Sequence, residues 1–268
     1  MKDEDEISNP LEVRDLLLEK ERERILSKNV QPVYRLFHYA NSTTLDDNRL
    51  KLMSEASRIG QQDCKDFFEC IEQNRESWDD VYSLFKFSLS KATLCMNCMQ
   101  ESKPTGYDSH SFLRFESPQQ NVTLEQYVGM HLNGSVDVTN WKHEDGCNRI
   151  GNGKNSIRLT NVEETKFITI VVNRLVRSND GILSINNRKI SVQSDVLIKD
   201  ADDESHRFQP IAVIYHIGHV MSNDTRGHYM ADVCDAKTGK WFRTSDDDLP
   251  REISSVSGNG YIFLLKKV

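Results

Sequence analysis

The hydrophobic period of this chain changes once, between residues 85 and 90, and that change restricts the fold more than any other feature. Before it, from residue 9 onward, apolar residues recur at helical spacing. One buried helical face is predicted to consist of Cys64, Phe67, Phe68 and Ile71. After it, Phe85, Phe87 and Leu89 alternate with polar residues, which is typical of a strand. Helices followed by a largely antiparallel sheet predict an α+β fold.

Length and composition exclude several classes of protein. A chain of 268 residues can form one large domain or two small ones. Its net charge of -7 argues against nucleic acid as a partner, and no apolar run is long enough for a membrane span. The acidic N-terminus is not a secretory signal, and six cysteines are too few for a disulfide scaffold. We therefore expect a cytoplasmic or nuclear location.

A β-hairpin near residue 238 is the most informative local feature. The strand-like segments "MADVCD" and "KWFRT" flank "AKTG", whose Gly239 suits a turn. If the turn centres there, paired positions sum to about 475, and a slip of a residue or two brings His228 beside Ser245, Asp246 or Asp247. A histidine held by a partner on one ring nitrogen is half of a catalytic triad, because the partner sets the tautomer and the other nitrogen can act as a base. The more common alternative is a purely structural pair.

Several segments, in the same order along the chain, resemble the ubiquitin-specific protease family, which are papain-like cysteine proteases also called ubiquitin carboxyl-terminal hydrolases. The C-terminal pieces are "AVIYHIG", "GHY", the acidic segment after Trp241 and the closing "YIFLL". Upstream, "QQDCKDFF" is similar to the family's Gln-Gln-Asp box, and "CMNCMQES" to the first Cys-x-x-Cys of its zinc ribbon. "IVVNRLVRSNDG" looks like its Leu-x-Arg-Phe strand. The resemblance covers roughly residues 30–268.

The resemblance implies a hand-shaped fold with a helical thumb, an antiparallel β palm and β-ribbon fingers. On this basis residues 30–84 form the thumb, residues 85–165 the fingers and residues 166–268 the palm. Residues 1–29 form an amphipathic helical extension. The domain is expected to be incomplete at its N-terminus, because the family's Asn-x-Gly-Asn-Thr-Cys-Tyr box is absent from the printed residues.

The family hydrolyses the isopeptide bond at the ubiquitin C-terminus with a cysteine thiolate, which the resemblance makes the expected reaction class. His228 matches the family's histidine. Ser245 occupies the position of its third triad member, normally Asp or Asn, and Asp246 follows directly. Ubiquitin or ubiquitinated proteins are the expected partners. The positions matching the family's contacts with the ubiquitin tail are Gln62, Asp63 and Tyr229, and Asp63 alternatively serves only as a helix N-cap.

The nucleophile has no counterpart, since Cys64 is the first cysteine of the chain. Cys64 belongs to a buried helix face, and Cys234 lies roughly 20 Å along its strand from His228. The sequence therefore predicts a domain that binds ubiquitin without hydrolysing it. An active deubiquitinase whose gene model is truncated at the N-terminus is the alternative, as is a non-catalytic scaffold.

The fingers contain the only metal-ligand spacing that we identify. Cys95 and Cys98 form half a zinc knuckle, and the second half is reduced to Cys147, with His143 four residues before it. No cofactor is required by the expected chemistry. A structural zinc held by three cysteines and one histidine is one prediction, and loss of metal binding is the other.

Overall fold

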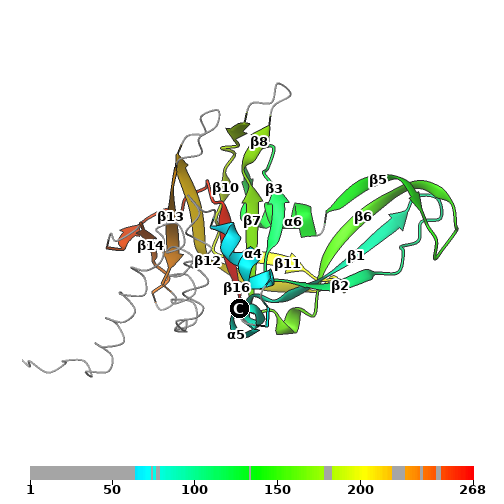
Figure 1. Cartoon of the computed structure of the whole chain (residues 1–268), viewed down its shortest axis with the longest axis horizontal. Coiled ribbons are helices and arrows are strands. Elements are labelled where there is room, and N and C mark those ends of the chain that lie inside the picture. Colours follow the sequence, from blue (N-terminus) through cyan, green and yellow to red (C-terminus); the bar gives the residue numbers. More distant parts are fainter. Residues whose placement is uncertain are drawn as a thin grey trace, which may run out of the picture.

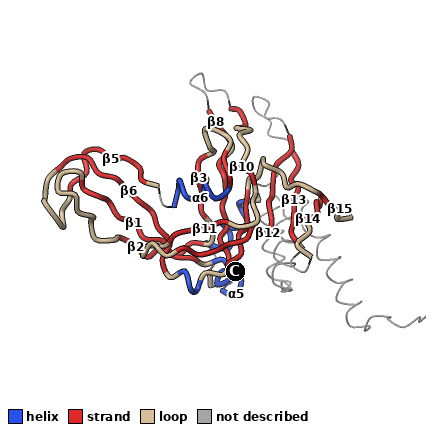
Figure 2. The backbone as a smooth tube through the Cα atoms, turned by 180° about the vertical axis from the view of Figure 1, so that it is seen from behind, coloured by secondary structure: helices blue, strands red, loops and turns tan. Residues whose placement is uncertain are grey.

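The computed structural model describes residues 64–268, except residues 74, 77–78, 133, 178–182, 219–226, 236–237 and 246–248. The helical extension expected over residues 1–29, and the helices expected before residue 64, lie outside these described residues. Strands dominate the remainder, and helices cover parts of the sheets, as the tube in Figure 2 shows. The expected α+β fold is confirmed.

The body of the molecule is an eight-stranded sheet. Its order is β15-β14-β13-β12-β16-β7-β3, with β11 also paired to β12. β3 and β7 pair in parallel, and the other neighbours are antiparallel. The strands are β3 Leu113–Glu116, β7 Phe167–Asn173, β11 Val196–Lys199, β12 Ser205–Gly218, β13 Gly227–Cys234, β14 Trp241–Thr244, β15 Arg251–Ile253 and β16 Ile262–Lys267.

A second, four-stranded sheet extends from the body as a long arm, at the right of Figure 1. Its order is β2-β1-β6-β5, and all of its pairs are antiparallel. The strands are β1 Phe87–Cys95, β2 Thr105–His110, β5 Ser135–Lys142 and β6 Ile150–Thr160. The strands of the arm lie within residues 85–165, the range expected for the fingers, which stays a prediction. β3 lies within the same range but pairs with β7 in the main sheet.

Smaller elements connect the two sheets. Helix α6 (Leu124–Leu132) starts with a capping box, because Thr123 Oγ1 accepts from the N–H of Gln126 and Gln126 Oε1 accepts from the N–H of Thr123. Strands β4 (Val122–Thr123) and β10 (Ile190–Ser191) form a short parallel pair. β8 (Leu175–Arg177) and β9 (Leu183–Ile185) form a separate hairpin, and η1 covers Val162–Glu164.

Two hydrophobic cores lie on opposite faces of the main sheet. One contains Cys64 and Phe68, from the start of helix α4 (Lys65–Gln73) and the residue before it, together with α5 (Asp79–Phe85). The other contains α6 and the base of the arm. The burial predicted for Cys64 and Phe68 is confirmed. Phe85, expected in a strand, instead ends α5, because its ring stacks on Phe167 of β7 at 5.4 Å between centroids.

Candidate functional site

Strands β13 and β14 form the predicted hairpin in the predicted register. Ala231 faces Thr244 and Cys234 faces Trp241, so paired positions sum to 475. The turn contains Gly239 with φ of 69°, a conformation that L side chains rarely adopt. Ser245 follows directly after β14 and therefore lies near the start of β13.

His228 and Ser245 meet at the open end of this hairpin. Nε2 of His228 lies 2.6 Å from Oγ of Ser245, which is a short hydrogen-bond distance. Of the three partners predicted for the histidine, Ser245 makes this contact, and Asp246 and Asp247 lie outside the described residues. The imidazole is partly buried, as is the serine.

This arrangement has a defined chemistry. When Nε2 carries the ring proton, it donates to Oγ of Ser245, and Nδ1 becomes the basic nitrogen. A hydroxyl partner orients the ring and selects the tautomer as a carboxylate would, but it carries no charge to stabilise an imidazolium. The pair can therefore position a base, with weaker electrostatic support than a His–Asp pair gives.

Of the three residues predicted to contact a ubiquitin tail, the structure describes only Tyr229. Gln62 and Asp63 lie outside the described residues. Tyr229 alternates with His228 along β13 and faces the core beneath α4 and α5, where its side chain is 8% exposed. It lies edge-on to His216 at 5.0 Å between ring centroids. A tail contact by these residues stays a prediction.

The described cysteine side chains outside the arm have surroundings unsuited to a nucleophile. Cys64 is 1% exposed and belongs to the core under the helices. Cys234 lies at the far end of β13 from His228. Burial, followed by the nearby Asp235, raises the pKa of the Cys234 thiol and so disfavours the reactive thiolate.

Four potential metal ligands converge at the end of the arm. Cys95 ends β1, Cys98 lies in the turn after it, and His143 and Cys147 lie in the loop between β5 and β6. Their ligand atoms all lie within 4.8 Å of one another. The sulfur atoms of Cys95 and Cys147 are 3.7 Å apart, and Cys98 Sγ is 3.2 Å from Nδ1 of His143. The sequence named these four residues from the Cys-x-x-Cys spacing and from the resemblance to the family's zinc ribbon.

The donor set fits a tetrahedral zinc ion. Zn–S bonds of about 2.3 Å imply sulfur atoms about 3.8 Å apart in a tetrahedron, close to the Cys95–Cys147 separation. Burial raises the pKa of Cys95, but the backbone N–H groups of Cys98 and Asn97 and the neighbouring thiols outweigh it and lower that pKa to about 6. A low thiol pKa favours the thiolate that a metal binds.

His143 is oriented by contacts with residues that are not metal ligands. Sequence reasoning did not identify these contacts. The His143 ring is 1% exposed and stacks on Trp141 at 5.2 Å between centroids. Nε2 lies 3.3 Å from Oδ1 of Asp145, and Oδ2 of Asp145 accepts from the N–H of Lys103 at 2.6 Å. A carboxylate on the nitrogen remote from the metal is the usual arrangement for a histidine ligand. The spacing His-x-Asp in this loop was the available signal.

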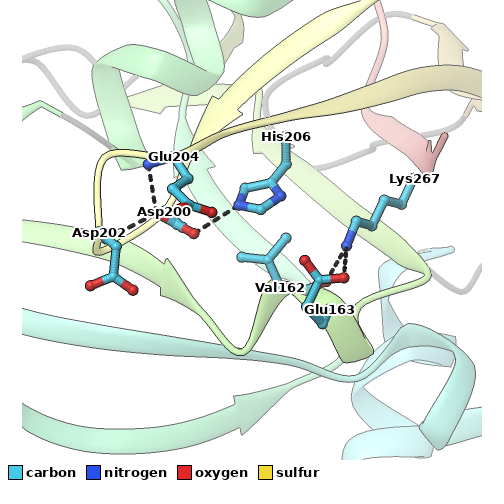
Figure 3. Close-up of polar contacts among 7 residues, drawn as sticks. All are labelled: Val162, Glu163, Asp200, Asp202, Glu204, His206 and Lys267. Atoms are coloured by element: carbon cyan, nitrogen blue, oxygen red, sulfur yellow. Dashed lines mark hydrogen bonds and ion pairs between the residues drawn. The ribbon is translucent and has the colours of Figure 1, made fainter.

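Another polar group lies at the turn between β11 and β12, shown in Figure 3. Asp200 Oδ1 accepts from the N–H groups of Asp202 and Glu204, both at 2.9 Å, and Oδ2 lies 2.7 Å from Nε2 of His206. A cation could also be held by Asp200, Glu204 and His206. The hydrogen bonds show instead that Asp200 stabilises the turn through two backbone N–H groups and pairs with His206.

The chain belongs to the ubiquitin carboxyl-terminal hydrolase family, since the model of that family matches residues 12–264. A search of curated proteins found no match. The solved structures that match include the SAGA DUB module of Ubp8, Sgf11, Sus1 and Sgf73 bound to monoubiquitin, with 17% identity and a TM-score of 0.66. The same module bound to ubiquitin aldehyde matches with 17% identity and a TM-score of 0.66. A yeast SAGA DUB module matches with 17% identity and a TM-score of 0.63.

These likenesses confirm the deubiquitinase fold expected from the sequence. The three matches cover 81%, 97% and 81% of this chain. This chain spans 51% of the Ubp8-module chain in the monoubiquitin complex, 65% in the ubiquitin aldehyde complex and 52% in the yeast module. In the part of the chain that the structure describes, no helix is both long and apolar enough to cross a membrane.

Proposed function

We propose that this domain binds ubiquitin and carries the histidine half of a thiol-protease site. The observation that supports the proposal is the 2.6 Å contact between His228 and Ser245, at the hairpin position where the family places its catalytic histidine and third triad member. In the family reaction the histidine first accepts the thiol proton and later protonates the leaving amine. Nδ1 of His228 is the nitrogen assigned to these transfers.

The same 268-residue polypeptide is proposed to lack turnover. Of the cysteines whose side chains the structure describes, Cys64 is enclosed in the core, Cys95, Cys98 and Cys147 belong to the metal group, and the raised pKa of Cys234 disfavours its thiolate. An active deubiquitinase, in which a cysteine box outside these residues completes the site, is the alternative. A scaffold that has lost contact with ubiquitin is another, and it would still contain the His–Ser pair as a structural feature.

Zinc is the metal proposed for the Cys95, Cys98, His143 and Cys147 group. Three thiolates and an imidazole at these separations match its preferences, and four protein ligands leave no open position for catalysis. Zinc would join the turn after β1 to the β5–β6 loop and so keep the end of the arm ordered. Its proposed role is structural.

Partners and location follow from the family and remain proposals. Two of the three matching SAGA structures contain the Ubp8 module bound to monoubiquitin or to ubiquitin aldehyde, and a ubiquitin moiety is the ligand proposed here. A ubiquitinated protein in the cytoplasm or nucleus would present such a moiety. Nucleic acid is not proposed as a partner, because the net charge of -7 offers no overall attraction for it.

Two measurements test the proposal. Titration of the purified chain with ubiquitin should give a saturable isotherm, and an isotherm indistinguishable from that of an unrelated protein would exclude ubiquitin binding. An electrophilic ubiquitin probe should leave every cysteine unmodified, in parallel with a His228→Ala variant as the matched control. A probe adduct that forms with the natural chain and disappears in the variant would establish an active enzyme and identify its nucleophile.

A further inference from the structure

An ion pair with a buried carboxylate lies on the same hairpin as the His228–Ser245 pair. Asp232 is fully buried, and both of its carboxylate oxygens are used. Oδ1 accepts from Nε of Arg243 at 2.8 Å, and Oδ2 accepts from NH2 of the same guanidinium at 3.1 Å. Oδ1 also accepts from the hydroxyl of Tyr215 at 3.3 Å, and Oδ2 from the N–H of Ser257 at 2.8 Å. The carboxylate therefore joins β12, β13, β14 and the segment after β15.

The position of this pair in the hairpin is the second observation. Asp232 and Arg243 face each other directly in the β13–β14 ladder. Asp232 is four residues after His228 on an unbroken stretch of β13, so the two side chains point to the same face of the sheet. Arg243 is two residues before Ser245 and, by the same alternation, points to that face as well.

From this geometry we infer that Asp232 and Arg243 are positioning residues that fix the β13–β14 register and thereby hold Ser245 against His228. The turn closes with backbone hydrogen bonds between Asp235 and Lys240 and from Gly239 to Asp235, and β14 adds only four residues to the ladder. A specific side-chain pair across the two strands therefore reinforces one register against a slip. A slip of one residue would carry Ser245 to the opposite face and separate it from the imidazole. A bidentate Arg–carboxylate pair has only one good geometry, so it selects one register.

The surroundings of the guanidinium make this selection strong. Arg243 lies over the ring of Tyr215 at 5.4 Å from its centroid, and the hydrogen bonds that it donates to Asp232 raise the pKa of Arg243. Burial, followed by the charge of Asp232, raises the pKa of Tyr215 to about 12, which keeps its hydroxyl a donor. In a slipped register the buried carboxylate would lose its charged partner and keep only the donors from Tyr215 and Ser257, which is unfavourable.

The role of the pair is distinguishable from general stabilisation by a suitable control. Asp200→Asn removes another largely buried carboxylate from the same sheet, at the β11–β12 turn, where Asp200 accepts from two N–H groups and contacts His206. Figure 3 shows this group, which belongs to the opposite end of β12 from the β13 hairpin. Asp200→Asn should lower stability without affecting His228.

The readout is the ring of His228, observed by 15N NMR of the full chain. Ser245→Ala provides the reference spectrum of a ring that has lost its contact with Ser245. We expect Asp232→Asn to move the ring nitrogen shifts to that reference and to make the Nε2 proton exchange about tenfold faster, the effect of one hydrogen bond. Arg243→Lys, which keeps the charge but not the two-pronged geometry, should give an intermediate exchange rate. Asp200→Asn should leave the ring signals unchanged.

Two results would overturn the inference. The first is a folded Asp232→Asn variant whose His228 ring nitrogen shifts and Nε2 proton exchange equal those of the natural chain, because the register would then not depend on the pair. If Asp232→Asn fails to fold, the same comparison with Arg243→Lys decides the question. An equal change in Asp200→Asn would show that His228 responds only to overall stability. The inference gains its functional meaning from the proposed site, but the test uses no ubiquitin. A failed ubiquitin titration would therefore refute the proposed function and leave this result standing.

Discussion

Removal of a single ligand from the group at the end of the arm has a calculable effect. Cys147→Ser would leave three ligands, and a structural zinc site needs four. Cys95 and Cys147 are 52 residues apart, and a cross-link closing such a loop would contribute about 4 kcal/mol in the chain-entropy description. The β1–β6 ladder already places Cys95 opposite Gly153, however, only six residues beyond Cys147. Closing that shorter segment is worth about 2 kcal/mol.

We expect Cys147→Ser to lower the free energy of unfolding by about 2 kcal/mol, because the β1–β6 ladder forms with or without metal. For a domain of this size this loss corresponds to a melting temperature lower by about 4 to 8 °C. Circular dichroism would measure the shift, and metal analysis should give about one zinc per natural chain. Cys234→Ser is the matched control, since that thiol lies in the main sheet away from the group.

The reasoning fails if the purified natural chain contains less than half an equivalent of zinc, or if a chelator leaves its melting temperature unchanged. A loss of unfolding free energy close to about 4 kcal/mol would mean that the β1–β6 ladder itself depends on the metal. Hydrogen exchange separates the two cases, because a local effect should deprotect the turns around Cys98 and Cys147 and leave the amides of β7 protected.

Two further predictions concern other parts of the chain. Asp63→Ala should weaken ubiquitin binding about tenfold if its carboxylate meets a basic group of the tail, the effect of one charge-assisted hydrogen bond; an unchanged isotherm with the fold intact would refute the tail role. Burial raises the pKa of Asp200, but the hydrogen bonds from His206 and the N–H groups of Glu204 and Asp202 outweigh it, and the net pKa is lowered. Its stabilising contribution is therefore present above the unfolded carboxyl pKa of about 3.9 and disappears as the pH falls through the lower folded value. Stability curves of natural chain and Asp200→Asn should converge in that acidic window, and a constant difference down to the lowest pH would contradict the assignment.

The hairpin was predictable because its information is local. A glycine turn and two alternating segments fix the register to within a residue or two, and the observed sum of 475 agrees with the prediction. The sequence left Ser245 and Asp246 as alternative partners for His228. That choice depends on the direction of the chain after β14 ends, which alternation does not determine.

The sequence predicted which residues belong to the metal group but not how they are arranged in space. Spacing, ligand type and the resemblance to a zinc ribbon named four residues, whereas their convergence results from the pairing of β1 with β6 and of β6 with β5. The parallel contact of β3 with β7 had no local signal at all. Parallel neighbours are joined by long connections, so their pairing is decided by the assembled core.

The sequence by itself therefore determined the fold class, the β13–β14 hairpin and the identity of the residues that can do chemistry. These depend on periodicity, turn residues and side-chain type, all of which act over a few positions. Only the tertiary structure decided that Asp232 is enclosed with Arg243, that Tyr229 faces the core and that Cys98 meets His143. Each of these facts depends on which distant segments exclude water from a side chain, and no stretch of a few residues contains that information.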